Sequence, residues 1–260
     1  MAGYRIGCHT LTWGNFLRDY PLKNALCEIK EAGYDGVEMY DALARLGPAV
    51  SFRTQLSEAG LELASLSANV RVTSDEKSDI AEAKEKAYFA GQFGVKALMV
   101  TGGWRGDGLS KDVKSYKALC KRLDSLAEYS SGFNVRIAFH NHLDTIVEEE
   151  RDIANLLEFS GSVKLCVDTG HLAAAGSDPA GVIERYRSSV ALVHLKDWDP
   201  RARDFAELGR GVLCHNMKNI LASLNKINYT GWVVVELDRT STTPFESARI
   251  SRGFLRGIGY

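Results

Sequence analysis

Four short apolar segments in the second half of the chain each end in a residue that can bind a metal ion. They are Arg136–His140, Lys164–Asp168, Val190–His194 and Val233–Glu236. Their β-branched-rich composition is typical of buried strands. In a parallel barrel, the carboxyl ends of the strands meet at one mouth, where active sites lie. Two imidazoles and two carboxylates gathered there would suit one divalent cation, with Mn²⁺ expected first and Co²⁺, Mg²⁺ or Zn²⁺ as alternatives.

Side chains at or beside these strand ends could also move protons. The candidates are Glu236, His171, His142 and Lys196. Strand alternation would send His142 to the same side as His140, so at least one of these two rings is expected to face the cavity. A histidine three residues after Asp168 can lie over the same cavity as that carboxylate. Lys196 could instead hold a substrate oxygen, and the sequence does not decide between the two roles.

Further polar and aromatic residues follow the expected strand ends and could contact a substrate. The candidates are His9, Trp13, Glu38, Arg71, Trp104 and Arg210, and Tyr40, Asn69 and Thr101 follow the same strand ends. Tryptophan rings often pack against the C–H faces of sugars, and arginine can hold hydroxyl, carboxylate or phosphate oxygens. Glu38 could alternatively be the hydrogen-bond partner of a metal ligand. Ordinary packing or a surface position is the competing interpretation for each of them.

The metal-ligand candidates have structural interpretations as well. Asp168 could cap a helix, and His194 could be a buried core histidine. Glu236 could be paired with Arg239, because a buried carboxylate must be paired or metal-bound. The two histidines at the end of the fifth strand could be a purely structural pair.

Strand and helix signals alternate along the whole chain. In addition to the four segments above, the last of them extended to Trp232–Glu236, strands are expected at Tyr4–Leu11, Gly36–Met39, Leu61–Ala68 and Ala97–Thr101. Helices are expected at Pro21–Ala32, Pro48–Ala59, Asp75–Phe93, Lys111–Tyr129, Asp152–Phe159, Pro179–Arg187, Asn216–Lys226 and Phe245–Leu255. Ser74 is the expected N-cap of the third helix. About eight strand–helix units predict an α/β fold, a single (β/α)8 TIM barrel over residues 1–260. A doubly wound open sheet is the structural rival, but it usually needs fewer units.

Composition sets limits on the partners and the location. A net charge of −1 gives no broad field that would attract nucleic acid or an anionic membrane. No apolar run approaches the ~20 residues of a membrane span, and the first ten residues lack the features of a signal peptide. The five cysteines are scattered and include no CxxC pair, which predicts free thiols in a reducing cytoplasm.

The segments that carry the candidate residues resemble the xylose isomerase-like TIM-barrel superfamily of sugar phosphate isomerases and epimerases. The likeness runs nearly from end to end, through TLTWGNF, GYDGVEMYD, IAFHNHLDT, VDTGHLAAAGSDP, VHLKDWDP, FAELGRGV, YTGWVVVELDRT and PFESARISRGFLRGIG. Within that superfamily the chain resembles in particular the inosose (2-keto-myo-inositol) dehydratase-like proteins. The combination is specific for the superfamily and weak for any one substrate.

The resemblance implies a ligand set with one departure. Ketose epimerases of the superfamily hold one divalent metal with Glu, Asp, His and Glu at four strand ends. Asp168, His194 and Glu236 match three of these positions, and His140 stands where the first Glu would be. Because the epimerases use the two Glu residues as paired acid and base, this substitution favours elimination over reversible epimerisation. The dehydratase-like group carries His-x-His at this point, as this chain does.

The superfamily also contains zinc-dependent abasic-site endonucleases, whose motifs resemble Asp168, His171 and His194. Their three-zinc cluster needs additional histidines, including an Asp-x-His motif after the seventh strand. This chain has 6 histidines and none in Pro200–Gly211, which counts against DNA repair.

Three functions remain open from the sequence. The first is a lyase that removes a proton alpha to the carbonyl of a keto-sugar or keto-cyclitol and eliminates a β-leaving group. The second is an isomerase or epimerase that reprotonates the same enolate, acting on a free or phosphorylated ketose. The third is a non-catalytic carbohydrate-binding or accessory subunit. The expected partner is therefore a small molecule, and a homo-oligomer is also considered because barrels of this kind often pair.

Overall fold

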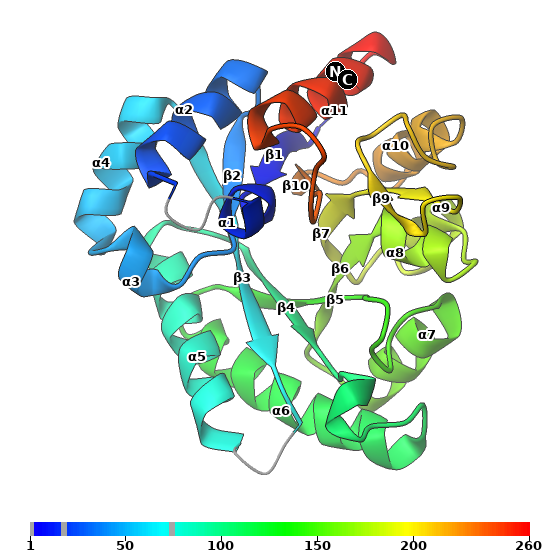
Figure 1. Cartoon of the computed structure of the whole chain (residues 1–260). Helices are drawn as coiled ribbons and strands as arrows, with labels where there is room; N and C mark the ends of the chain where they lie inside the picture. Colours follow the sequence, from blue (N-terminus) through cyan, green and yellow to red (C-terminus); the bar gives the residue numbers. More distant parts are fainter. Residues whose placement is uncertain (1–2, 17–19, 73–75) are drawn as a thin grey trace.

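A closed ring of parallel strands forms the centre of the structure (Figure 1). The computed structural model describes residues 3–16, 20–72 and 76–260. The barrel strands are β1 (Arg5–His9), β2 (Gly36–Met39), β3 (Glu62–Val70), β4 (Ala97–Gly102), β5 (Arg136–His140), β6 (Lys164–Asp168), β7 (Val190–Leu195) and β10 (Trp232–Val235). Neighbours in the ring follow the chain order, and β10 closes it by pairing with both β7 and β1. The predicted (β/α)8 TIM barrel is confirmed.

The helices surround this ring (Figure 1). They are α1 (Leu11–Phe16), α2 (Leu22–Ala32), α3 (Leu43–Leu46), α4 (Ala49–Ala59), α5 (Glu76–Gln92), α6 (Val113–Ser131), α7 (Glu150–Phe159), α8 (Thr169–Ala174), α9 (Pro179–Arg185), α10 (Met217–Lys226) and α11 (Pro244–Gly257), with a 3-10 turn η1 (Arg105–Asp107). Several ends follow ordinary capping chemistry. Asp112, Asp178 and Thr243 accept backbone N–H bonds at the starts of α6, α9 and α11. Gly33 ends α2 with φ of 97°, a left-handed conformation that favours glycine.

The strands are buried on both faces, which explains their nearly continuous apolar runs. One apolar cluster fills the space between the strands and the helices. A smaller cluster fills the inside of the barrel and is built mainly from small residues: Ala64, Ala97, Met99, Ala138, Cys166, Ala191, Leu192 and Val234. The polar residues at the carboxyl ends of the strands therefore lie above a closed floor.

The structure corrects the sequence-based elements in a few places. Leu11 was expected in the first strand, but β1 ends at His9 and Leu11 begins α1. The His9 ring favours this break, because its Nδ1 accepts the backbone N–H of Leu11 at 3.1 Å. The short helix α8, which starts directly after β6, was not predicted. Ser74 and the first residue of its helix, Asp75, lie outside the described residues.

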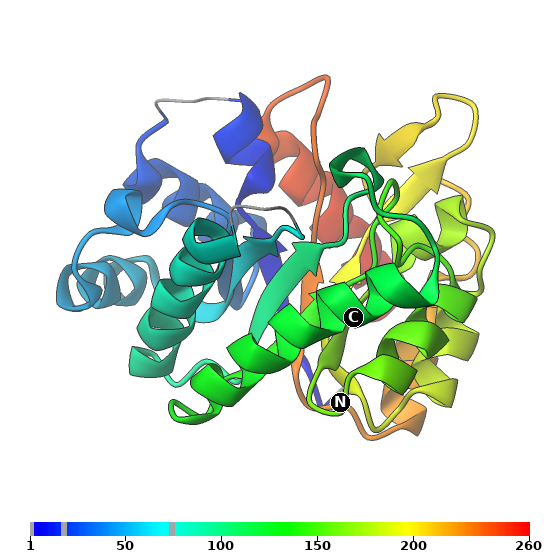
Figure 2. The ribbon, with the colours of Figure 1, turned by 90° about the horizontal axis from the view of Figure 1, so that it is seen from below.

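A two-stranded antiparallel hairpin, β8 (Asp197–Asp199) and β9 (Asp204–Ala206), follows β7 and was also missed. In Figure 2 this hairpin (yellow) projects from the upper end of the barrel. Asp197 anchors its base, because its carboxylate accepts the backbone N–H groups of Trp198, Gly209, Gly211 and Leu213. Among the described residues, no helix is long and apolar enough to cross a membrane.

Candidate metal centre and active site

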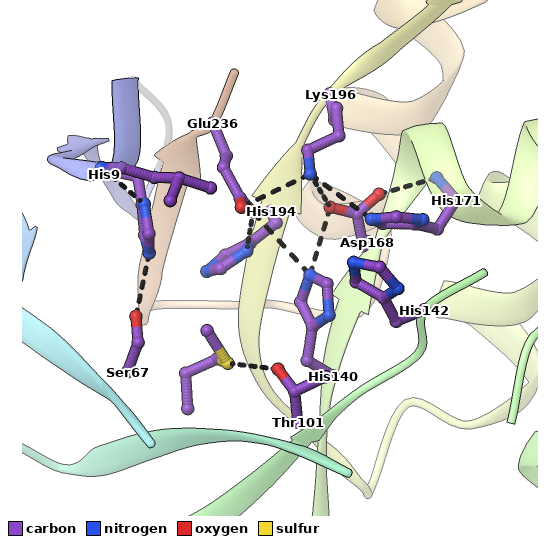
Figure 3. A network of polar contacts seen from close by, with 12 residues as sticks. His9, Ser67, Thr101, His140, His142, Asp168, His171, His194, Lys196 and Glu236 are labelled. Carbon is purple, nitrogen blue, oxygen red and sulfur yellow. Dashed lines mark hydrogen bonds and ion pairs between the residues drawn. The ribbon is translucent and has the colours of Figure 1, made fainter. Parts of the chain in front are cut away.

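Four buried side chains from the ends of four barrel strands converge at one point (Figure 3). His140, Asp168, His194 and Glu236 each offer a ligand atom, and these atoms all lie within 4.8 Å of one another. His140 Nε2 is 3.2 Å from Asp168 Oδ2, and His194 Nδ1 is 2.5 Å from Glu236 Oε2. The exposed fraction of these residues is at most 6%. The structure thus brings together all four of the residues that the sequence suggested as metal ligands.

The charge state of this cluster fits a divalent cation. Burial alone would raise the pKa of Asp168 and Glu236, but the Lys196 ammonium and the neighbouring histidines together outweigh it and keep both values below the ordinary one. Two carboxylates and two imidazoles form a mixed nitrogen and oxygen donor set of the kind that Mn²⁺ and Zn²⁺ accept. The described residues therefore fit a metal site by their chemistry and their convergence.

Asp168 has a structural role and a site role at the same time. Its Oδ1 accepts the backbone N–H of His171 at 2.7 Å and caps α8, while its Oδ2 faces His140. Its backbone is fixed by the Asn141 side chain, which bonds to the Asp168 N–H at 2.9 Å and to the carbonyl at 3.2 Å. The helix cap thus holds the second carboxylate oxygen toward the cluster.

A buried polar chain supports His194 from the other side. His194 Nε2 lies 3.0 Å from Glu38 Oε2, and Ser67 Oγ donates to Glu38 Oε1 at 3.1 Å. His9 Nε2 contacts the same Ser67 hydroxyl at 2.8 Å (Figure 3). Burial would raise the pKa of Glu38, but His194 and His9 outweigh it and lower this pKa to about 2. Glu38 is fully buried and lies behind a candidate metal ligand, where it orients the ring through its second nitrogen.

Metal binding is expected to release protons from this cluster. Although burial lowers the pKa of both rings, contacts with Asp168 and Glu236 raise the pKa of His140, and contacts with Cys166, Glu38 and Glu236 raise that of His194 well above its usual value. Without a cation the His194 ring is therefore protonated near neutral pH and His140 holds a proton more tightly than an ordinary histidine, whereas only a neutral imidazole can bind a metal. Titrating chelator-treated protein with Mn²⁺ at neutral pH should release ~1–2 protons per ion, and the apparent affinity should rise with pH. Calorimetry in buffers of different ionisation enthalpy measures this, and a heat that is independent of the buffer would contradict it.

Lys196 lies at the edge of the cluster and is completely buried. Its Nζ is 2.8 Å from Asp238 Oδ1, 3.3 Å from Glu236 Oε1 and 3.3 Å from His171 Nε2. Burial lowers the pKa of Lys196, but the carboxylates of Glu236, Asp238 and Asp168 outweigh it, so the amine stays charged. Burial and this ammonium hold the pKa of His171 well below its usual value, so the His171 ring is neutral.

A cavity of about 590 Å³ opens above the cluster. Five of the predicted residues line it, and besides His142 they are His9, Trp104, His140 and Glu236. His142 lines it as well, with its Nδ1 2.6 Å from the Leu143 carbonyl, which leaves Nε2 as the acceptor nitrogen. Burial, His140 and Lys196 lower the pKa of His142 to about 4, so this ring is neutral near pH 7.

The Trp104 wall of the cavity is fixed by two neighbouring loops. The indole Nε1 donates to Asn69 Oδ1 at 2.9 Å, and the ring lies edge-on to His142 with centroids 4.9 Å apart. Trp104 also forms an isolated backbone bridge with Thr145 in the next loop. The neighbouring Arg105 reinforces this bridge, because its Nη1 donates to Glu148 at 2.7 Å.

Several predicted site residues do not line this cavity. Trp13 is buried, and its indole donates to Glu28 Oε2 at 2.7 Å. Arg71 is paired with Asp107, and Arg210 is paired with Glu207 at 3.2 Å. Five others, Glu38, Asp168, His171, His194 and Lys196, are buried directly behind the cavity wall.

The cavity also contains residues that were absent from the predicted substrate contacts. These are Leu11, Met99, Asp238 and Arg239, whereas Tyr40, Asn69 and Thr101, which were expected at this rim, line the cavity as well. Asp238 and Arg239 directly follow Glu236 and Leu237, so their place after the last strand was the available signal. Arg239 does not pair with Glu236, because its Nε lies 3.0 Å from Asp204 Oδ2 in the hairpin.

The fold and the convergent ligands define a TIM-barrel protein with a candidate metal centre at the carboxyl ends of its strands. Residues 26–258 match the family model described as Xylose isomerase-like TIM barrel, and the chain belongs to this family. The chain is 28% identical to the rhizopine catabolism protein MocC of Rhizobium meliloti, over 92% of its own length and 83% of the relative's. It is 26% identical to an inosose dehydratase of Geobacillus kaustophilus, over 97% and 94% of the two lengths. Its relatives are enzymes, and this protein is an enzyme, which removes the non-catalytic subunit from the open functions.

Solved structures share the same fold at lower identity. The 3-keto-D-glucoside 4-epimerase YcjR from E. coli superposes with a TM-score of 0.79 at 18% identity, covering 98% of this chain and 99% of the other. The IOLI protein, solved with a bound zinc atom, superposes with a TM-score of 0.79 at 19% identity, covering 98% and 97%. At these identities the likeness establishes the fold.

Proposed function

We propose that the protein is a divalent-metal-dependent lyase that dehydrates a keto-cyclitol or keto-sugar, as the inosose dehydratases among its relatives do by name. The observation that carries this proposal is the position of the His140, Asp168, His194 and Glu236 cluster at the base of a cavity of about 590 Å³. Such a cavity is large enough for a small polyol. Mn²⁺ is the cation we propose, because the set combines imidazole with carboxylate ligands.

The four cluster residues would hold the cation. A bound divalent ion supplies Lewis-acid polarisation of a carbonyl, which acidifies the neighbouring C–H bond. The chain's own residues must then move the proton and stabilise the developing charge.

His142 is the residue we assign to proton transfer. Of the four candidates, it and Glu236 line the cavity, and both oxygens of Glu236 are already in contact with other groups. The free Nε2 of His142 can accept the proton from the carbon alpha to the carbonyl. The same imidazolium then donates this proton to the leaving β-hydroxyl as the C–O bond breaks, so the products are an unsaturated ketone and water. Lys196 acts from behind, where its ammonium orients Glu236.

An isomerase or epimerase is the second candidate. It shares proton removal with the lyase, but the enolate is reprotonated rather than losing hydroxide. Its support is the epimerase among the structural neighbours. His140 in place of the Glu that the epimerase resemblance requires counts against it. A second carboxylate base is then missing from the first of the four ligand positions.

Incubation of the purified enzyme with 2-keto-inositol and with several ketoses in D₂O, in the presence of Mn²⁺, separates these functions. The lyase is expected to convert the keto-inositol into a product that has lost one water, which mass spectrometry detects. Solvent deuterium in an isomeric product would instead support the isomerase or epimerase. No turnover of any keto substrate with Mn²⁺, Co²⁺, Mg²⁺ or Zn²⁺ would count against both.

The remaining expectations are proposals as well. A small molecule is the proposed partner, with no role for nucleic acid or membrane. A cytoplasmic location follows from the cysteine pattern, and all five thiols are free in the structure. A homo-oligomer of two barrels is tested by measuring the molecular mass of the protein in solution.

A further inference from the structure

A second cavity lies at the opposite end of the barrel from the metal cluster. Its volume is about 410 Å³, and its lining includes the first residues of several strands, among them Arg5, Arg136, Val190 and Trp232. We call it the lower cavity. The amino ends of TIM-barrel strands ordinarily serve stability, so a polar cavity there is a separate feature.

The lining of the lower cavity is strongly basic. Four cationic side chains contribute to it: Arg5, Lys96, Arg136 and Arg187. No Asp or Glu is present among its described lining residues. Since the chain as a whole carries a net charge of −1, this concentration of positive charge is local.

Most of this charge is uncompensated. Arg5 is paired with Glu62, and its guanidinium lies over the Trp232 ring at 4.0 Å from the centroid. Within the part of the chain that the structure describes, no carboxylate forms an ion pair with Lys96, Arg136 or Arg187. The contact that Arg136 makes is neutral, a long Nε–H bond of 3.4 Å to the Lys96 carbonyl. Three like charges around one cavity repel one another, and an anion between them would relieve this repulsion.

The cavity also has depth. Four of its lining residues, Ala64, Ala97, Ala191 and Leu192, belong to the small-residue cluster inside the barrel, and three of these are alanines. Short side chains at these positions leave the cavity extending toward the barrel axis. The cationic side chains are exposed, so their head groups can adjust to a ligand that enters from solvent.

A neighbouring hollow of about 1040 Å³ provides an internal comparison. It shares Lys96 and Arg136 with the lower cavity, but Asp124 and Glu128 line it too. Those carboxylates would repel an anion, so the favourable position is on the side of the two shared cations that faces the barrel axis.

We propose that the lower cavity binds a small multivalent oxyanion of the phosphate type, at a site separate from the metal centre. Guanidinium groups bind phosphate oxygens through paired, charge-assisted hydrogen bonds, which is why arginine suits this ligand. Arg136 and Arg187 provide these bonds, and Lys96 adds a point charge. The small size of the cavity favours a single phosphate or diphosphate group over a polymer.

The test is calorimetric titration with pyrophosphate at constant ionic strength, on the enzyme as purified. Saturable binding is expected, together with a rise in the melting temperature, because a ligand of the folded state stabilises it. The double variant Arg136→Gln/Arg187→Gln should bind at least ~10-fold more weakly for each guanidinium removed. Arg151→Gln is the matched control, since it removes one exposed charge from the first turn of α7, at the other end of the barrel, and should bind like the wild type.

Each outcome decides the proposal. Pyrophosphate could also bind at the metal centre, but that binding would persist in the double variant, so equal affinity in the double variant and the wild type would overturn the assignment. No saturable heat with the wild type would overturn it as well. The readout is the shift caused by the ligand, so a change in the basal stability of the double variant does not disturb the comparison.

Discussion

Replacing Asp168 with asparagine is expected to abolish metal binding while the barrel stays folded. The amide oxygen of asparagine can still accept the His171 N–H that caps α8, so the helix start is retained. The charge that faces His140 is lost, and with it one anionic ligand. Metal affinity should fall by more than the ~10–100-fold typical of changes behind the ligands. Because metal catalysis supplies several kcal/mol, kcat/KM should fall at least ~10³-fold.

Metal analysis after dialysis measures the loss of metal binding, and circular dichroism measures whether the barrel stays folded. Asp178→Asn is the matched control, because Asp178 caps α9 through Ala180 and Gly181 and has no contact with the cluster. The control should bind metal and turn over like the wild type. If the Asp168 variant retains as much metal as the wild type, the four-residue cluster is not the metal-binding site of this protein.

Replacing Glu38 with glutamine is expected to weaken metal binding indirectly, through the loss of its contact with His194. Glu38 contacts the second nitrogen of His194 and does not belong to the four-residue cluster, so the loss in metal affinity should be ~10–100-fold. The variant should also be less stable. The pKa of Glu38 is lowered from 4.5 to about 2 in the folded protein, which corresponds to about 3 kcal/mol at neutral pH.

The pH dependence of this stability difference follows from its sign. A carboxylate with a lowered folded pKa stabilises the fold above its unfolded pKa, and this contribution disappears as the pH falls through the folded value. Urea unfolding of metal-free protein should thus show a difference between wild type and Glu38→Gln near pH 7 that shrinks between pH 4.5 and about 2. Glu62→Gln, an exposed change on the neighbouring strand, should shift stability by less than ~0.5 kcal/mol. A pH-independent difference would show that the charge of Glu38 is not involved.

Much of the fold could be predicted from the sequence because strand burial leaves a local signal. The bounds of β5 and β6 were predicted correctly, since their apolar runs stop at His140 and Asp168. The alternation of strands and helices then fixed the order around the barrel, and the barrel brings the strand ends together. The convergence of the four candidate ligands follows from that topology.

The rest depends on contacts that no local pattern reports. Ser67 lies 58 residues from His9 and 29 residues from Glu38 in the chain, yet its hydroxyl contacts both side chains. Nothing in the sequence around Ser67 indicates that it belongs to the hydrogen-bond network of the site. Trp13 follows the first strand, as a substrate contact would, but α1 turns its indole into the interior, where Glu28 accepts its N–H. The hairpin β8–β9 was missed because its strands have three residues each, too few for an alternation to register.

The bridge between Trp104 and Thr145 has a consequence for the range of molecules that the enzyme can accept. The side of the cavity that includes Trp104 and His142 is built from two loops joined through their backbones, so neither can change length without displacing the other. Tyr40, on the far side, is 48% exposed; its backbone N–H donates to Thr10 Oγ1 at 2.9 Å, but its side chain forms no hydrogen bond among the described contacts. Divergence toward larger or smaller substrates would therefore be tolerated first at Tyr40, and a library of variants aimed at new specificity should begin there.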